Sequence, residues 1–115
     1  MLVRVDPTAS EALYLQIAAR VRSSIGGGEL APGEQLPPAR ELAESLGVNM
    51  HTVLRAYAEL RDEGLVEMRR RRGVIVREAG PGRARLVELV QQVAAEARRQ
   101  GLVVGDVQNL VEEIW

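Results

Sequence analysis

The sequence predicts a mainly α-helical fold with one small β-hairpin, followed by a short tail of two helices. Three observations predict this fold class. Apolar residues recur at helical spacing through most of the chain, two short β-branched runs flank a run of arginines, and aromatic residues make up only 3% of the chain. A core of Leu, Val, Ile and Ala suits packed helices, and 115 residues are enough for one compact domain with a small appendage.

The first helix is expected over about residues 10–26. Apolar side chains recur in it every four positions, which places them on one buried face. These residues are Leu13, Ile17, Val21 and Ile25. Three consecutive glycines from Gly26 end the helix, because glycine is favoured just past a helix C-terminus. Residues 2–5, ahead of this helix, alternate weakly and are expected to form a short strand or an extended arm.

Two short helices are expected after a turn-rich link at residues 30–38. The first begins with Pro38, which has no N–H to lose at the first helical position, and continues to about residue 46, where Gly47 ends it. The second is capped by Asn49, which accepts a backbone N–H of the first turn, and ends at Gly64. The residues expected to face inward are Leu42, Ala43 and Leu46 in the first helix and Val53, Tyr57 and Leu60 in the second.

A β-hairpin with an arginine tip is expected next. Residues 65–68 and 74–77 predict two strands, which residues 69–73 join. Two short helices with a tight turn between them form a helix-turn-helix, whose second helix lies in the major groove of DNA, and the hairpin makes this a winged helix-turn-helix. The formal net charge is −1, yet residues 69–85 hold seven Arg and one Glu, a local balance of +6. This distribution indicates a basic surface for phosphate groups.

The remaining residues predict a dimerisation tail. Residues 79–83 read Ala-Gly-Pro-Gly-Arg and are expected to form a hinge, followed by helices over about residues 83–100 and 104–114. Two amphipathic helices bury little surface alone, so a second copy of the chain is the simplest partner for their apolar faces. We therefore expect a DNA-binding domain over residues 1–78 and a dimerisation tail over residues 79–115. The residues expected at the dimer interface are Leu86, Leu89, Val90, Val93, Ala97, Val107, Leu110, Val111 and Ile114.

Catalysis, metal binding, a cofactor and a membrane location are not expected. The chain has no cysteine and a single histidine, His51, which is too few ligands for a metal site. Glu112 and Glu113 have no third group with which to form a catalytic site. No apolar segment resembles a signal peptide or a bilayer-spanning helix, so a cytoplasmic protein is expected.

The chain resembles the GntR family of bacterial regulators over about residues 11–77. The resemblance rests on many residues at fixed spacing, which are Leu13-Tyr-Leu-Gln-Ile17, Gly28-Glu-Leu-Ala-Pro-Gly-Glu-Gln-Leu-Pro37, Arg40-Glu-Leu-Ala43, Gly47-Val48, Thr52-Val53, Ala56-Tyr57, Leu60 and Glu63-Gly-Leu-Val66. The tail and residues 48–57 resemble the YtrA subfamily, and this implies dimerisation through the tail and repression of operons for ABC-type transporters. The chain departs from the family at Pro38 and Ala39, which replace a small residue and a Glu, and at Arg71, where the wing commonly has Gly.

One set of residues is expected to bind DNA: Arg40, Asn49, Met50, His51, Thr52, Arg55, Arg69, Arg70, Arg71 and Arg72. The guanidinium fork of arginine matches a phosphate or a guanine edge, and the first turn of a recognition helix meets bases. The alternatives are surface ion pairs of Arg40 with Glu44 and of Arg55 with Glu59, a capping role alone for Asn49, and a solvated loop for the arginine run. Tyr14 and Tyr57 are expected to be core or interface aromatics.

The expected function is that of a homodimer which binds double-stranded DNA at an inverted-repeat operator and represses transcription. One alternative is a protein-interaction or architectural winged helix with weak or no specific DNA binding. Another is a fragment of a longer regulator, against which the closing helix argues. A small-molecule effector of unknown identity would act at the dimer interface or the hinge, because the tail is too short for a ligand-binding domain.

Overall fold

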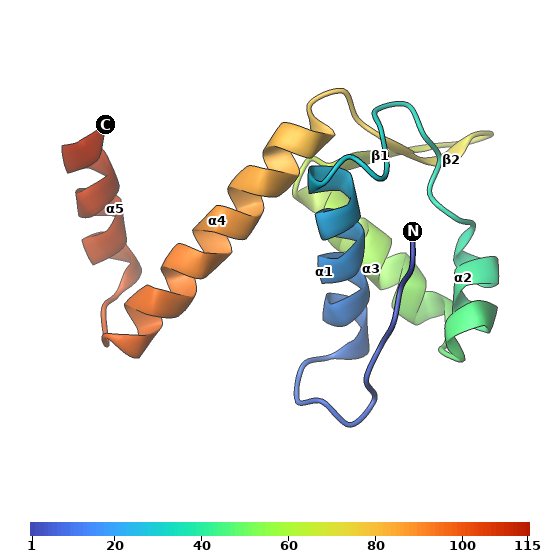
Figure 1. Ribbon diagram of the computed structural model, residues 1–115, viewed down its shortest axis with the longest axis horizontal. Helices are drawn as coiled ribbons and strands as arrows, with labels where there is room; N and C mark the ends of the chain where they lie inside the picture. Colours follow the sequence, from blue (N-terminus) through green and yellow to red (C-terminus); the bar gives the residue numbers. More distant parts are fainter. The chain divides into compact units, whose positions relative to one another are not determined.

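The computed structural model describes residues 1–115 and has the predicted fold class, with five helices and one two-stranded hairpin (Figure 1). The elements in chain order are α1 (Leu13–Gly26), α2 (Ala39–Leu46), α3 (Met50–Asp62), β1 (Val66–Arg69), β2 (Gly73–Val76), α4 (Gly80–Arg99) and α5 (Val104–Ile114). The chain divides into two compact units, residues 1–85 and residues 86–115. The domain boundary expected after residue 78 therefore lies within the first unit.

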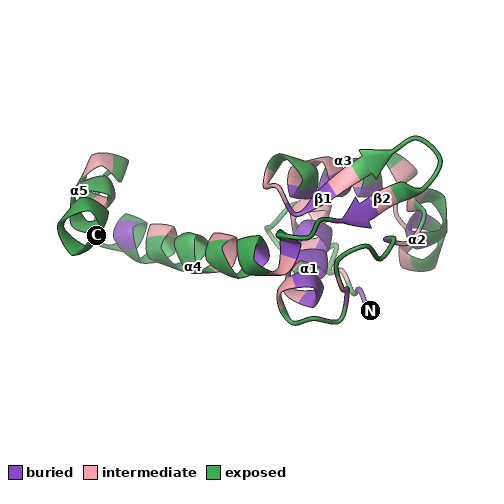
Figure 2. Ribbon diagram, turned by 90° about the horizontal axis from the view of Figure 1, so that it is seen from above, coloured by how far each residue is buried: buried purple, intermediate pink, exposed green.

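The core of the first unit lies where α1 and α2 pack against α3. The buried stripes predicted from helical spacing are confirmed in α1 and α3 except at Leu13, which is half-buried. Figure 2 shows buried residues in purple. Six predicted residues are each at most 1% exposed, namely Ile17, Val21, Ile25, Val53, Tyr57 and Leu60. In α2, Leu42 and Ala43 are buried and Leu46 is half-buried.

Helix α1 begins at Leu13, three residues later than expected, because the residues before it form a hydrogen-bonded turn. The Asp6 carboxylate accepts hydrogen bonds from the backbone N–H and the hydroxyl of Thr8, at 2.9 and 2.6 Å. These bonds hold the pKa of the Asp6 carboxyl below its usual value. The Gln16 amide bonds both to the N–H of Asp6, at 2.7 Å, and to its carbonyl, at 2.9 Å, which ties this turn to α1.

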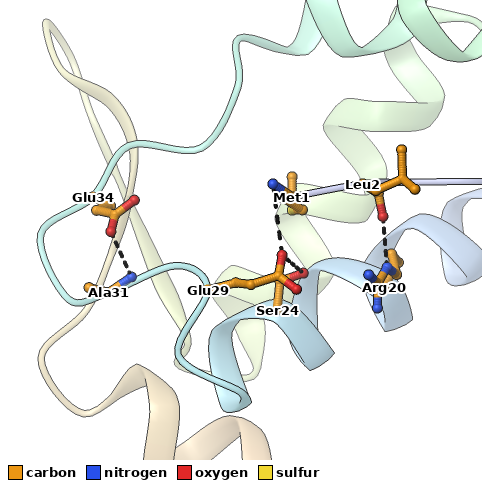
Figure 3. Close-up of polar contacts among 7 residues, drawn as sticks. All are labelled: Met1, Leu2, Arg20, Ser24, Glu29, Ala31 and Glu34. Carbon is orange, nitrogen blue, oxygen red and sulfur yellow. Dashed lines mark hydrogen bonds and ion pairs between the residues drawn. The ribbon is translucent and has the colours of Figure 1, made fainter.

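Residues 1–5 form an extended arm and no strand, which decides between the two predicted conformations. Arg20 donates from Nε to the Leu2 carbonyl at 2.7 Å, and the terminal amino group of Met1 lies 3.7 Å from the Glu29 carboxylate (Figure 3). Val3 is buried. The arm is therefore held along the first unit by one apolar and two polar contacts.

The link before α2 forms part of the wing, which the sequence did not predict. Gly33 and Leu36 donate to the carbonyls of Val76 and Val74, each at 2.8 Å, and Val76 donates to Glu34 at 2.9 Å. The link thus pairs with the outer side of β2 like a short third strand. Pro38 was expected to be the first helical residue, but its ψ of 139° is extended, so it stands at the N-cap position just outside α2, where its side chain makes no capping hydrogen bond.

The strands of the wing lie about one residue from their predicted positions, and residues 70–72 form the tip between the paired residues Arg69 and Gly73. Gly73 has a φ of +75°, whereas no residue other than glycine has a positive φ. The left-handed conformation that this turn needs is therefore supplied by Gly73. The arginine at position 71 costs no backbone strain, although the family commonly has glycine there.

The hinge predicted at residues 79–83 is wrong, because Gly80, Pro81 and Gly82 form the first turn of α4. Pro81 is tolerated there since the N–H groups of a first turn have no acceptor within the helix. Gly80 allows a close approach to the backbone just ahead of β1, because a Cβ on Gly80 would lie 2.8 Å from the carbonyl oxygen of Leu65. The glycines and proline that looked like a flexible break are thus a tightly packed helix start.

The second unit consists of the rest of α4 and of α5. Helix α5 has the predicted bounds, and the Asp106 carboxylate accepts the N–H of Val103 at 3.0 Å ahead of its first turn. Ala97 is buried within this unit, whereas α5 has no buried residue at all. The apolar side chains of the unit are therefore largely exposed.

Candidate nucleic-acid interface

The N-terminus of α3 is a capped and accessible helix end. Asn49 has an extended backbone, and its side-chain oxygen accepts the N–H of His51 at 2.8 Å, so the predicted cap is confirmed. The side chains of Asn49 and His51 are exposed, and those of Met50 and Thr52 are half-buried. The first turn therefore presents polar side chains and the positive end of the helix dipole to solvent.

Arg55 lies one helical turn after His51 on the exposed side of α3. The alternative ion pair with Glu59 does not form. Instead, the Cζ atom of Arg55 lies 3.8 Å from the ring centroid of Tyr14, which is a cation–π contact between α3 and the first turn of α1. Tyr14 is half-buried, so it is not a core residue, which was one of the two predictions for it.

A shallow hollow lies around this contact. Its lining residues are Leu13, Tyr14, Asn49, His51, Thr52 and Arg55. The hollow thus gathers four of the ten residues predicted to bind DNA, together with two residues of α1. None of its lining residues carries a carboxylate, which leaves a neutral to basic surface.

Leu54 is an exposed apolar residue in the middle of α3 that the sequence analysis missed. It is 38% exposed and follows the buried Val53 directly. The signal was its position outside the buried stripe, since an apolar residue there has no core to enter. An apolar side chain on a recognition helix can contact the methyl group of thymine.

Arg40 is the second residue of α2 and is exposed. The alternative ion pair with Glu44 is absent, and the guanidinium has no hydrogen-bond partner in the chain. Its five N–H donors are thus available to an outside acceptor.

The four consecutive arginines from Arg69 to Arg72, at and beside the wing tip, are all exposed, but they are not equivalent. Arg69 is paired with Glu67 on the same strand, with its Nη2 atom 2.7 Å from the Glu67 carboxylate. Arg70, Arg71 and Arg72 have no partner in the chain. The free positive charge of the tip therefore comes from three residues.

The other three arginines of the basic run, Arg77, Arg83 and Arg85, differ in their contacts within the chain. Arg83 donates from Nε to the Glu63 carbonyl at 3.0 Å, and Arg85 donates to the Gly26 carbonyl at 3.4 Å. These carbonyls lie at the C-terminal ends of α3 and α1, where a positive charge is favourable. The sequence had counted both residues toward a basic working surface, but they cap helices. Arg77 is exposed and has no partner.

Two polar contacts, both largely shielded from solvent, hold α3 in place, and neither was predicted. Arg22 of α1 binds Glu63, the C-cap of α3, through two parallel hydrogen bonds of 2.7 Å, and the two side chains are only 5% and 16% exposed. The Tyr57 hydroxyl donates to the Pro37 carbonyl at 2.7 Å, and burial raises the pKa of Tyr57 well above its usual value.

No three His, Cys, Asp or Glu residues gather in a cluster that could hold a metal ion. No helix is both long and apolar enough to cross a bilayer.

Comparison with known proteins relates the chain to a family of bacterial regulatory proteins. A family model described as bacterial regulatory proteins of the gntR family matches residues 13–76. The chain is 34% identical to the HTH-type transcriptional regulator Rv1152 of Mycobacterium tuberculosis, over 97% of this chain and 93% of that protein. It is 30% identical to the HTH-type transcriptional repressor YtrA of Bacillus subtilis, over 98% of this chain and 92% of that protein.

Two solved structures are similar to the chain. YtrA from Sulfolobus acidocaldarius, a GntR-family transcription factor, is 36% identical with a TM-score of 0.65, and the match covers 82% of this chain and 99% of that one. The structure of AraR(DBD) in complex with operator ORE1 is 25% identical with a TM-score of 0.56, and the match covers 66% of this chain and 93% of that one.

Proposed function

The chain belongs to the GntR family of bacterial regulatory proteins, so it is a DNA-binding transcription regulator, and we propose that it represses transcription as a homodimer bound to an inverted-repeat operator. Regulators of this family are non-enzymatic DNA-binding proteins. The proposal depends above all on the first two turns of α3, where a capped helix end and the exposed Arg55 surround a hollow without carboxylates. Because its target is the chromosome, the protein would act in the cytoplasm.

We propose that α3 enters the major groove. Its first turn, Asn49 to Thr52, would meet base edges and phosphates, and Arg55 would meet a base one turn further on. Arg40 of α2 would bind a phosphate or a guanine edge beside it. The structure of AraR(DBD), which is similar to this chain, is a complex with operator DNA, and this supports double-stranded DNA as the partner.

The wing would bind the flanking DNA backbone. Arg70, Arg71 and Arg72 are exposed and unpaired, so each can approach a phosphate without breaking a contact within the chain. Arg69 would first have to leave Glu67, which makes it the weakest of the four candidates. Such contacts add affinity for any DNA sequence.

The second unit would form the dimer. Its exposed apolar side chains include Leu86, Leu89, Val90, Val93, Leu110, Val111 and Ile114. They remain exposed although α4 and α5 are both formed, so a second copy of the unit is the partner that would remove them from water. Ala97 and Val107 line the groove between α4 and α5, and Ala97 is already buried there. The pairing would depend mainly on the other seven residues.

Selection of bound duplexes from a random library tests the proposal. We expect an enriched inverted repeat, bound at least about 10³-fold more tightly than random duplex at physiological salt. Replacing Arg70, Arg71 and Arg72 together with Ala should make the affinity depend less steeply on salt concentration. The slope of log affinity against log salt should fall by the equivalent of up to about three phosphate contacts. Equal affinity of the wild-type protein for all duplexes would instead favour an architectural or protein-interaction module.

Two further parts of the proposal concern which genes are regulated and whether their transcription is lowered or raised. The resemblance to the YtrA subfamily leads us to propose an operon for an ABC-type transporter as the target. A reporter gene placed behind the selected operator should be repressed by the wild-type protein, and a rise in expression would identify an activator instead.

A further inference from the structure

We propose that Tyr14 is a positioning residue that holds Arg55 ready to bind the edge of a guanine in the operator. This inference rests on the proposed function and adds a residue of α1 to the recognition surface. The observation that carries it is the contact between the Arg55 guanidinium and the Tyr14 ring, with 3.8 Å between Cζ and the ring centroid.

The contact leaves the hydrogen-bonding edge of Arg55 free. A guanidinium stacked on a ring uses its flat face for the contact, while its N–H donors point outward in its own plane. Arg55 has no ion pair or hydrogen bond in the chain, and the hollow around it contains no carboxylate. A bidentate acceptor is the partner that fits this edge, and the O6 and N7 atoms of guanine form one in the major groove.

Tyr14 is well placed to restrain Arg55. It lies in the first turn of α1, whose next turn carries Ile17 and Ala18, both fully buried. Gln16 also ties the start of α1 to the turn at Asp6 through two hydrogen bonds. The position of the ring is therefore fixed by α1, whereas Arg55 on the exposed side of α3 has no hydrogen bond or ion pair to fix its rotamer.

The consequence is a lower entropic cost of DNA binding. An exposed arginine samples many rotamers, and binding a base in one of them costs conformational freedom. A stacked arginine has lost part of this freedom before DNA arrives. Tyr14 would thus raise specificity for guanine without touching the base.

The test compares the full-length wild-type protein with Tyr14→Leu, Tyr14→Phe, Arg55→Ala and the double variant Tyr14→Leu/Arg55→Ala. Each protein is titrated with the selected duplex, with duplexes in which each guanine of the half-site is replaced in turn, and with a random duplex. Tyr14→Met serves as a second non-aromatic variant if Tyr14→Leu fails to fold, and circular dichroism checks the folding of all variants. In the absence of DNA, the NMR shift of the Arg55 Nε–H reports the ring current of Tyr14.

We expect Tyr14→Leu to bind the selected duplex roughly threefold to tenfold more weakly and to lose preference at one guanine, with unchanged affinity for random duplex. Tyr14→Phe keeps the ring and should stay within about twofold of the wild type. In the Arg55→Ala background, Tyr14→Leu should have no further effect, and the Arg55 Nε–H should shift in Tyr14→Leu but not in Tyr14→Phe.

Three results would overturn the proposal while leaving the proposed function intact. They are unchanged specificity in Tyr14→Leu, additive losses in the double variant, and an equal loss in Tyr14→Phe and Tyr14→Leu. The last result would mean that the Tyr14 hydroxyl binds DNA itself. A wild-type protein with no sequence preference would overturn the proposed function and this proposal together.

Discussion

Replacing Glu63 with Gln should destabilise the first unit by about 3 kcal/mol. Arg22 and Glu63 are joined by two hydrogen bonds of 2.7 Å and are only 5% and 16% exposed. The amide keeps one acceptor, so one charge-assisted bond worth roughly 1.5–3 kcal/mol is lost. The guanidinium is also left buried without a counter-charge, and losing one partner of a buried pair costs about 3–5 kcal/mol. The partial exposure of Glu63 moves the expected value to the lower end of that range.

Urea denaturation followed by far-UV circular dichroism, at a fixed protein concentration, measures this loss. A domain of this size has a total unfolding free energy of about 5–15 kcal/mol, so a loss of about 3 kcal/mol lowers the denaturation midpoint clearly. Asp62→Asn is the matched control, because it removes the neighbouring ion pair with Arg61, whose side chains are 49% and 69% exposed. We expect that control to cost less than about 1 kcal/mol.

A double variant tests the physical reason for the loss. Arg22→Met combined with Glu63→Leu removes both charges and should be more stable than Glu63→Gln, since an apolar pair leaves no buried charge unpaired. The reasoning would be refuted if Glu63→Gln matched the exposed control, or if the double variant were as unstable as the sum of its two single variants.

Three further predictions concern the packing, a buried hydroxyl and the dimer. Gly80→Ala should lower the free energy of unfolding by about 1–3 kcal/mol, because the new Cβ would lie 2.8 Å from the Leu65 carbonyl oxygen. Gly82→Ala places its Cβ no nearer than 3.9 Å to any atom packed against it, so it should be neutral or stabilise α4 by up to about 1 kcal/mol. Thermal melts of the pair measure both, and equal effects would contradict the close approach. Tyr57→Phe should lower the free energy of unfolding by about 1 kcal/mol, since the partly buried hydrogen bond from the Tyr57 hydroxyl to the Pro37 carbonyl is lost. Because the pKa of Tyr57 is raised in the folded state, the unfolded chain ionises first, so the wild-type unfolding free energy should fall above about pH 10 more steeply than that of Tyr57→Phe. Leu86→Asp with Val90→Asp should give monomers in sedimentation, and a variant that stayed dimeric would move the interface elsewhere.

Much of the fold followed from local patterns in the chain. The stripe of Val53, Tyr57 and Leu60 is buried as expected because helical spacing alone decides which side chains share a face. The cap by Asn49 also follows from neighbours two residues apart. The same local reasoning wrongly predicted a hinge at Gly80 and Pro81, because glycine and proline occur both in loops and at the start of helices. The choice between the two depends on a packing contact of Gly80 with the Leu65 backbone, just ahead of β1, that no local pattern contains.

The sequence by itself determined the elements, the core stripes and a resemblance specific enough to indicate DNA binding. Only the tertiary structure decided which charged residues are free to act. Arg22 and Glu63 are 41 residues apart, and Arg85 reaches a carbonyl 59 residues away. The Tyr14 ring under Arg55 likewise depends on how α1 packs against α3. A basic run of residues looks uniform along the chain, but folding assigns Arg83 and Arg85 to helix ends and leaves the wing tip exposed. The reason is physical: periodicity fixes the direction of a side chain about its own helix, whereas its partner is set by the packing of elements distant in sequence.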